Sequence, residues 1–237
     1  MSGKQQIRIV RGDASAAQAT RPLYEQAFDD PPAFVDYYYR EKMKDSTVIT
    51  LEEENGVLSM LHLNPYTVSV RGTCVPSYYV VAVATDRLHR RKGYMTRVLD
   101  AAFAEMERER VPFCFLLPVD EAIYLPSGFE TICDFITRDN PLSALSYGAV
   151  RERFDVFCVQ DAVYERRRHE EDRLAALDAA EVLPENPVIM ARVTDREAYD
   201  ALFPDARANT GGPAGAGIHD GRLQALRALR CYFREEV

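Results

Sequence analysis

The sequence contains few cysteines and no long apolar run, and both features limit what the protein can be. Its five cysteines are an odd number, and no two of them form a CxxC pair. This usage argues against a disulfide framework and favours reduced, buried thiols in a cytosolic protein. No stretch approaches the roughly 18 apolar residues that cross a bilayer, and the first residues lack the apolar segment of a signal peptide. We therefore expect a cytoplasmic protein with no membrane partner.

A broad excess of basic residues and a metal-binding pattern are missing as well. The chain contains 29 Lys and Arg residues against 37 Asp and Glu residues, for a formal net charge of -8. General nucleic-acid binding requires a broad basic face, so we expect no nucleic-acid partner. The acidic balance suits a cationic substrate such as an amine. No His, Cys and Asp residues share the spacing of metal ligands, and we expect no metal.

Apolar sequence, in contrast, is plentiful. The chain has 237 residues, of which 47% are hydrophobic. This is enough to bury a sizeable core, and it argues against wholesale disorder. The length accommodates one large domain, or one domain with an appendage.

The first 140 residues predict a mixed α/β domain. Apolar periodicity and turn residues predict strands over 6–10, 48–52, 57–63, 68–70, 75–85, 113–117 and 129–137, and helices over 13–28, 33–43, 93–110 and 120–124. The helix over 93–110 has one apolar stripe and a charged back, as an amphipathic helix on a sheet should. It connects two apolar strands, which indicates one parallel strand pair with a crossover helix in an otherwise antiparallel sheet.

The sequence changes character after residue 140. Strands are expected over 154–159 and 188–193, and helices over 164–178 and 195–203, the first of them highly charged. A stretch rich in Gly, Ala and Pro over 204–217 predicts a flexible linker. The spacing of Leu223, Leu226, Leu229 and Phe233 predicts a final amphipathic helix. We divide the chain into a domain over 1–140, a connector over 141–185 and a C-terminal region over 186–237.

The stretch over 81–95 carries the strongest functional signal. It predicts an apolar strand, a basic turn and the first turn of a helix. A helix N-terminus offers unpaired backbone N–H groups and the positive end of the macrodipole. Gly93 permits a close approach to the backbone, and Arg90, Arg91 and Lys92 add positive charge. This combination suits a pyrophosphate, and hence a nucleotide-like ligand such as coenzyme A.

The same stretch resembles the GNAT N-acetyltransferases. Their acetyl-coenzyme A motif is Gln/Arg-x-x-Gly-x-Gly/Ala, and Arg90, Gly93 and Met95 stand at its three defined places. Met95 departs from the usual small residue. With this methionine, the sequence resembles the enhanced-intracellular-survival branch of the superfamily. In that branch an Ile-Tyr-x-x-x-Gly-Phe/Tyr segment carries the catalytic tyrosine. Tyr124 is the matching residue. The resemblance covers about residues 7–138.

The resemblance implies a donor, an acceptor and a set of site residues. The donor is acetyl-coenzyme A, and the acceptor is a primary amine of a small molecule or a lysine. Tyr124 protonates the departing thiolate, an acid role suited to a phenol with a reference pKa near ~10. The end of the strand pairs with the pantetheine amides, and the following turn holds the pyrophosphate. The implied coenzyme-binding residues are Val83, Ala84, Thr85, Arg90, Arg91, Lys92, Gly93, Tyr94, Met95 and Thr96.

Other residues are candidates for the chemistry by their type alone. His62 and His89 qualify as bases, although a strand-face or surface role is the simpler interpretation of each. Cys114 has no basic neighbour in sequence and is better explained as a core residue than as a nucleophile. Several acidic residues beside a tyrosine run either line an amine-binding cleft or form a solvated helix face: Asp29, Asp30, Asp36 and Glu41, near Tyr37, Tyr38 and Tyr39.

The C-terminal half falls short of what this resemblance implies. Members of that branch usually carry a second GNAT-like domain and a sterol-carrier-like domain, and their terminal carboxylate serves as the base. Residues 154–178 resemble the start of the former and residues 187–193 the start of the latter, so this half is abbreviated. This leaves open whether Val237 reaches the site, and whether the chain is a homo-oligomer. It also leaves a second function open, a non-catalytic GNAT fold that binds acyl-coenzyme A or scaffolds a partner.

Overall fold

The computed structural model describes residues 4–54, 56–175, 183–204 and 223–234. The strands are β1 (Gln6–Arg11), β2 (Thr47–Glu53), β3 (Gly56–Val70), β4 (Thr73–Thr85), β5 (Phe113–Leu116), β6 (Glu130–Asp134), β7 (Val156–Cys158), β8 (Val188–Val193) and β9 (Cys231–Tyr232). The helices are α1 (Ala14–Ala27), α2 (Pro32–Glu41), α3 (Tyr94–Arg108), α4 (Glu121–Tyr124), α5 (Tyr147–Arg153), α6 (Ala162–Ala175), α7 (Arg196–Leu202) and α8 (Gln224–Arg227). The predicted mixed α/β fold is confirmed.

The first four strands form an antiparallel meander. Strand β1 pairs with β2, β2 with β3 and β3 with β4. We predicted two strands over 57–63 and 68–70, and this is wrong: β3 is continuous, and Asn64 to Thr67 pair with β4 throughout. The sheet accommodates Pro65, which lacks an N–H group, because β3 has a neighbour on one side only at this point. Its pairing with β2 ends at Leu63 and its pairing with β7 begins at Val68.

The second part of the sheet is assembled from segments far apart in the sequence. Strand β5 lies parallel to β4, as predicted for a pair joined by a crossover helix. The strand order continues from β5 to β8 and then to β6, with β8 antiparallel to both neighbours. Strand β7 pairs with β3, and β9 lies parallel to β7. All nine strands therefore belong to one sheet, and β8 lies within it rather than in a separate C-terminal unit.

The predicted final helix over Leu223 to Phe233 is wrong. Only the short helix α8 forms there, and the chain then becomes strand β9, which pairs with β7. Leu226 and Phe233 are both fully buried. The apolar spacing that imitated a helix thus arises from packing against two different parts of the core. The linker predicted over 204–217 lies almost wholly outside the described residues.

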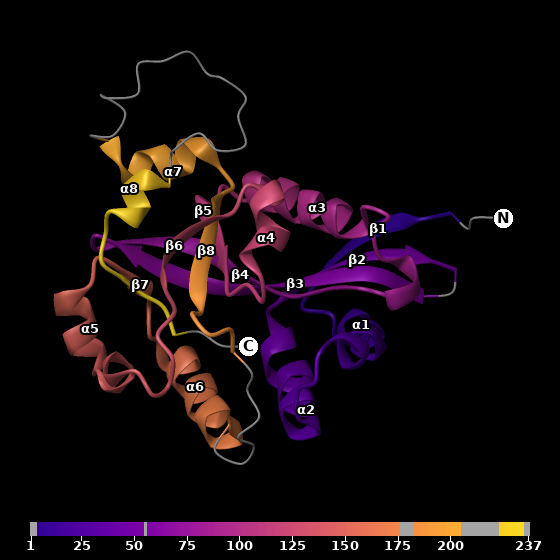
Figure 1. The fold of residues 1–237 in the computed structure, drawn as a ribbon, viewed down its shortest axis with the longest axis horizontal. Coiled ribbons are helices and arrows are strands. Elements are labelled where there is room, and N and C mark those ends of the chain that lie inside the picture. Colours follow the sequence, from indigo (N-terminus) through magenta and orange to yellow (C-terminus); the bar gives the residue numbers. More distant parts are fainter. Residues whose placement is uncertain (1–3, 55, 176–182, 205–222, 235–237) are drawn as a thin grey trace.

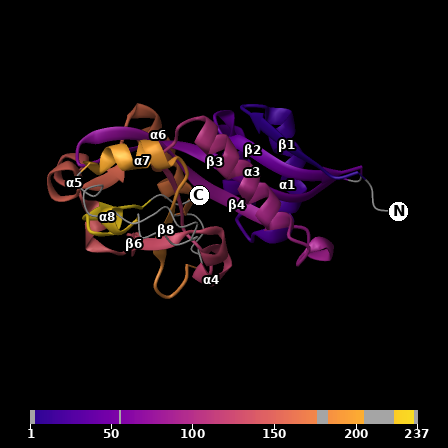
Figure 2. The ribbon, with the colours of Figure 1, turned by 90° about the horizontal axis from the view of Figure 1, so that it is seen from above.

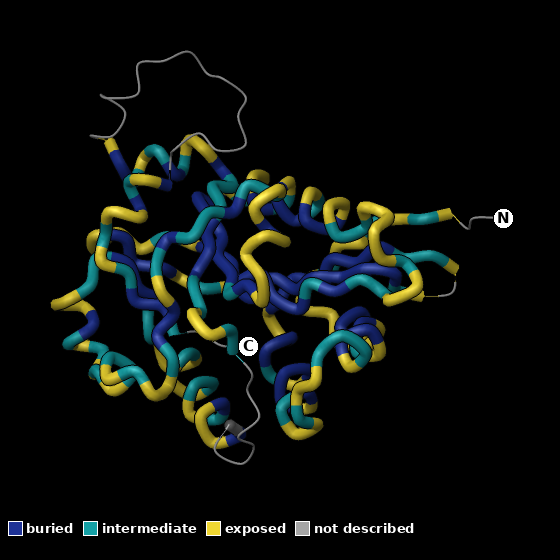
Figure 3. The backbone as a smooth tube through the Cα atoms, in the orientation of Figure 1, coloured by how far each residue is buried: buried dark blue, intermediate teal, exposed yellow. Residues whose placement is uncertain are grey.

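The helices cover both faces of the sheet. Figure 1 shows α3, α4 and α7 on one face and α1, α2 and α6 on the other, and Figure 2 shows α3 and α7 in front of the strands when the molecule is seen from above. Buried stretches follow the strands through the centre of the molecule (Figure 3). The predicted apolar stripe of α3 is confirmed, because five of its residues are buried: Val98, Leu99, Ala102, Phe103 and Met106.

Candidate functional site

Strands β4 and β5 separate along their length. They are parallel, yet only Tyr78 and Tyr79 of β4 pair with β5, opposite Cys114 and Phe115. Strand β4 continues to Thr85, paired with β3 alone. Residues 80–85 of β4 therefore present an edge that no described strand covers on the β5 side. An extended ligand can add to such an edge by backbone hydrogen bonds, and parallel sheets place their ligand sites at the carboxyl ends of the strands.

A β-bulge lies in this uncovered stretch. Met60 pairs with Ala84 and His62 with Val81, so two residues of β4, Ala82 and Val83, stand opposite one residue of β3. Ala82 adopts a φ of 52°, a left-handed conformation that is uncommon for alanine. Bulges bend a strand and redirect its backbone groups. No residue pattern in the sequence marks this bulge, because alanine has no preference for the left-handed conformation.

The turn after β4 leads into α3 as the sequence predicts. Gly93 is the N-cap residue of α3 with a φ of 75°, and no side chain caps the helix. A Cβ at this position would meet nothing within 4 Å, so the glycine is required by its backbone conformation, and the space beside it is open. Arg91 has a φ of 62° as well. Residues in the left-handed conformation just before an uncapped helix direct successive backbone N–H groups outward. This is the geometry of an anion-binding nest.

The charged side chains of this turn are exposed. Arg90, Arg91, Lys92 and Gly93 are all on the surface, and Tyr94 and Met95 are partly buried. The Arg90 Nε donates a hydrogen bond to the carbonyl of Thr85 at 3.3 Å, which connects the turn to the end of β4. The ten predicted coenzyme-binding residues thus follow one path from the end of β4 to the first turn of α3, with Ala84 buried and the basic turn exposed.

Tyr124 is the last residue of α4, which follows β5. Its ring is buried and lies edge-on to Phe129 at 5.8 Å between centroids. Burial raises the pKa of its phenol to about 12, so it keeps its proton at neutral pH. Within the described residues the hydroxyl forms no hydrogen bond, and burial alone accounts for the pKa shift. Since β4 and β5 are parallel, Tyr124 and the uncovered edge of β4 lie toward the same end of the two strands.

His62 does not have the environment of a base. It is fully buried, and its two ring nitrogens lie 2.9 Å from the Tyr38 hydroxyl and 3.1 Å from the Thr20 hydroxyl. Burial lowers the pKa of the imidazole to about 3. His89 lies in the turn, where its Nδ1 is 2.8 Å from Asp86. Of the two candidate bases, His62 is therefore a neutral structural residue of the core.

Three of the four acidic residues that we considered for an amine-binding cleft have partners within the chain. Asp36 pairs with Arg21, and Glu41 pairs with Lys44. Asp30 accepts a hydrogen bond from the Tyr24 hydroxyl at 2.6 Å, and burial raises the pKa of its carboxyl. These three carboxylates are therefore engaged by groups of the same chain.

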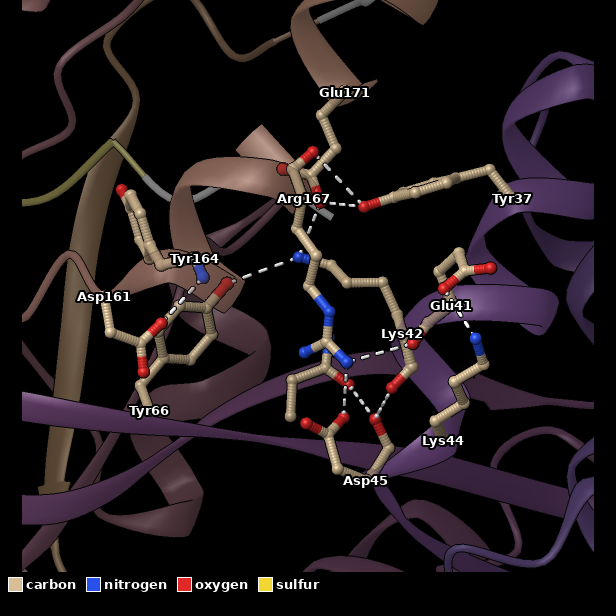
Figure 4. Close-up of polar contacts among 12 residues, drawn as sticks. Tyr37, Glu41, Lys42, Lys44, Asp45, Tyr66, Asp161, Tyr164, Arg167 and Glu171 are labelled. Atoms are coloured by element: carbon tan, nitrogen blue, oxygen red, sulfur yellow. Dashed lines mark hydrogen bonds and ion pairs between the residues drawn. The ribbon is translucent and has the colours of Figure 1, made fainter. Parts of the chain in front are cut away.

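The tyrosine run beside that cluster is buried, and Tyr37 belongs to a polar contact between α2 and α6 (Figure 4). Its hydroxyl donates to Glu171 at 3.0 Å, and the Lys42 ammonium lies 2.8 Å from the same carboxylate. Arg167 of α6 bonds to Asp45 and to the carbonyl of Glu41, each at 3.0 Å. A cavity of about 340 Å³ adjoins this contact, bounded by the middle of β3, the start of β4 and α6. It lies away from the end of β4 at Thr85.

The five cysteines lie at different depths in the fold. No disulfide joins any of them; Cys114 and Cys158 are buried, and Cys74 is exposed. Burial raises the pKa of the Cys114 thiol to about 12, as expected of a core residue. Within the described residues, no group of three or more His, Cys, Asp and Glu side chains could hold a metal. In the same residues, no helix combines the length and apolar character needed to cross a bilayer.

Comparison with known proteins places this geometry in a family. The family profile described as an acetyltransferase (GNAT) domain matches residues 8–132, more than half of the chain. No curated protein matches the sequence. Among solved structures, a probable N-acyltransferase from Enterococcus faecalis V583 matches with a TM-score of 0.50 and 17% identity, over 54% of this chain and 33% of that one. Eis1 from Mycobacterium abscessus matches with a TM-score of 0.52 and 17% identity, over 79% of this chain and 50% of that one.

These structural likenesses concern the fold alone, given their low identity. The chain spans about a third of the length of the first structure and half of the second.

Proposed function

Because the chain belongs to the GNAT acetyltransferase family, we propose that it transfers the acetyl group of acetyl-coenzyme A to a primary amine. The observation that carries this proposal is the uncovered edge of β4 leading into the uncapped start of α3 at Gly93. The edge suits the amide groups of an extended pantetheine arm, and the helix start suits a pyrophosphate. The two features occur in the order in which these groups follow one another in the coenzyme.

The residues of this surface divide the binding task between them. Val83, Ala84 and Thr85 offer backbone hydrogen bonds to the pantetheine amides. Backbone N–H groups from Arg91 to Thr96 hold the pyrophosphate, and the exposed Arg90, Arg91 and Lys92 side chains supply the neutralising charge. The bulge at Ala82 turns backbone donors away from β3, toward the side where the thioester carbonyl would lie.

Acetyl transfer then proceeds by attack of a neutral amine on the thioester carbon. A bond forms between nitrogen and carbon, the bond between carbon and sulfur breaks, and the nitrogen releases one proton to solvent, which returns one to the Tyr124 phenolate after each turnover. Tyr124 gives its proton to the departing thiolate, since its phenol is protonated at neutral pH. The acceptor is a small-molecule amine or a lysine. We also propose that the chain belongs to the enhanced-intracellular-survival branch of the family; the motif around Tyr124 supports this, and the fold likeness to Eis1 agrees with it.

Replacing Tyr124 by phenylalanine tests the proposal. We expect kcat to fall by about 10²- to 10⁴-fold, the usual contribution of a general acid, while the Kd of acetyl-coenzyme A stays within about twofold. Thiol release with a panel of polyamines, aminoglycosides and lysine peptides measures kcat, and calorimetry measures Kd. Tyr147→Phe is the matched control, because this partly buried tyrosine lies on α5, in a different part of the fold.

Two outcomes would contradict the proposal in different ways. Unchanged turnover in Tyr124→Phe removes this tyrosine from the chemistry. A parent protein that binds acetyl-coenzyme A, yet releases no thiol with any amine of the panel, supports the alternative function of a non-catalytic binding module.

A further inference from the structure

Arg192 of β8 is a partly buried cation without a direct ion pair in the described residues; only the charge of Asp100 acts on it from a distance. Within the described part of the chain, no Asp or Glu oxygen lies within ion-pair distance of its guanidinium, and its Nε is enclosed without a partner. Burial lowers the pKa of the group, and this effect outweighs the opposing influence of Asp100, as expected where a charge loses water without gaining a direct ion pair. A buried cation in this state is costly, and its remaining contacts have to offset the loss of hydration.

The first of these contacts reaches the chain next to Tyr124. The Nη1 of Arg192 donates a hydrogen bond to the carbonyl of Ser127. Ser127 ends the short 3₁₀ helix Leu125–Ser127, which continues α4 without a break. Gly128 closes the turn with a φ of 81°, and its N–H donates to the carbonyl of Leu125 at 3.0 Å. Arg192 thus holds the far end of a turn whose near end is Tyr124.

The second contact reaches the ring of Tyr124 through two phenylalanines. The Arg192 guanidinium carbon lies 3.6 Å from the centroid of the Phe103 ring on α3. Phe103 contacts Phe129 at 6.0 Å between centroids, and Phe129 contacts Tyr124 at 5.8 Å. A planar guanidinium can stack on a ring and donate in its own plane at the same time, whereas a lysine ammonium cannot reproduce both contacts.

We propose that Arg192 is a positioning residue for Tyr124. Its guanidinium fixes the Leu125–Ser127 turn by a hydrogen bond to Ser127 and the Phe103–Phe129 pair by stacking on Phe103, and these two contacts set the direction of the Tyr124 hydroxyl. The inference rests on the proposed function, in which Tyr124 is the acid. It gives the C-terminal half of the chain a part in catalysis, since β8 inserts between β5 and β6 and delivers Arg192 opposite Cys114.

Kinetics of Arg192→Met and Arg192→Lys test the inference in the full chain. Both variants should lower kcat by about tenfold or more, because small displacements of a catalytic group are costly, while KM for acetyl-coenzyme A stays within about twofold. The double variant Arg192→Met with Tyr124→Phe should be no slower than Tyr124→Phe alone, since a misplaced acid and an absent acid do not add. Arg227→Met is the matched control, an exposed arginine of the same half that lies 3.8 Å from Glu130 on β6.

A readout that needs no turnover separates this inference from the proposed function. In protein labelled with 3-fluorotyrosine, the ¹⁹F resonance of Tyr124 is assigned by its loss in Tyr124→Phe. That resonance should shift or broaden in Arg192→Met and Arg192→Lys, and stay unchanged in Arg227→Met. If Arg192→Met does not fold, the lysine variant, which keeps the charge, carries the test.

Each result decides the matter. An unmoved Tyr124 resonance, a kcat equal to that of the parent, or losses that multiply in the double variant overturns the positioning role. Complete restoration by lysine also overturns it, since charge alone would then suffice. A parent that binds acetyl-coenzyme A without any turnover defeats the proposed function, and the resonance then decides whether Arg192 orients Tyr124.

Discussion

The two faces of the central sheet use their polar groups in opposite ways. We call the face covered by α1, α2 and α6 the closed face. Three of its polar residues are buried, and each has partners within the chain: His62, Lys42 and Glu171. At the end of β4, on the way into α3, the backbone donors are uncapped and the basic side chains are exposed. Buried polar groups are normally satisfied. A group of unsatisfied donors at one place is therefore a better indicator of a ligand-binding site than the type of residue found there.

This difference explains why the candidate residues fared differently. A histidine and a set of carboxylates look reactive in a sequence, but a group whose hydrogen bonds are already made inside the protein has little left to offer a substrate. His62 is the clearest example, because its two ring nitrogens both lie within hydrogen-bond distance of hydroxyl groups. The turn at Gly93 has the opposite character, since its backbone conformation directs donors toward open space.

The closed face should depend most strongly on the ion pair between Lys42 and Glu171. Their side chains are 4% and 10% exposed, and removing one partner of a buried pair leaves an uncompensated charge. We expect Lys42→Met to lower the free energy of unfolding by about 3 kcal/mol, measured by urea denaturation. The Kd of acetyl-coenzyme A should stay unchanged under native conditions, because the site lies at the end of β4.

Two further variants sharpen this result. The double variant Lys42→Met with Glu171→Leu should recover most of the loss, since an apolar pair avoids the buried charge. Lys44→Met removes an exposed partner of Glu41 from the same segment and should cost at most about 1 kcal/mol. If Lys42→Met lowers the free energy of unfolding no more than Lys44→Met does, the ion pair between Lys42 and Glu171 does not stabilise the closed face.

The pH dependence of stability should come from the closed face as well. His62 has a pKa of about 3 in the folded protein, against about 6.5 in an unfolded chain. The unfolded state therefore binds the proton first as the pH falls, and the folded state loses stability from about pH 6.5 down to about pH 3. The loss is about 1.4 kcal/mol per pH unit over this window.

Urea denaturation of the parent and of His62→Gln between pH 7 and pH 4 measures this contribution. The variant should be less stable at pH 7 but lose less stability on acidification. His89→Gln, which removes a histidine outside the core, serves as the control for loss of an imidazole. If His62→Gln and the parent lose stability in parallel, His62 titrates alike in both states, and its burial has no part in the acid sensitivity.

The sequence could predict the features that depend on local contacts, and not those that depend on contacts between distant segments. The path from β4 through Gly93 to α3 lies within one short stretch, and a glycine, a basic run and an amphipathic period are all visible there. The turn around Tyr124 is local too, marked by Asp120 as helix cap and Gly128 as the closing residue.

The remaining features depend on partners that no local pattern names. Arg192 is 65 residues from Ser127, and Tyr37 is 134 residues from Glu171. The position of β8 between β5 and β6 could not be predicted either, because the residues of an apolar strand do not indicate which strands it pairs with. The bulge at Ala82 is the hardest case, since it sets an unusual backbone conformation on a residue with no preference for it.

Gly93 offers the finest test of the contrast between the two faces, because Gly72 provides a control of the same kind. Both glycines have a positive φ, 75° and 83°, and a Cβ added at either would meet nothing within 4 Å. Replacement by alanine should therefore impose a similar backbone strain, about 1 kcal/mol in the free energy of unfolding at each site. Gly72 lies in the hairpin before β4, at the opposite end of the strand from Thr85. Only Gly93→Ala should also weaken acetyl-coenzyme A binding, by several-fold in Kd, since its methyl group would occupy the open space beside the helix start. Equal affinities in the two variants would mean that the pyrophosphate does not approach the backbone at Gly93, and that the open groups there serve some other ligand.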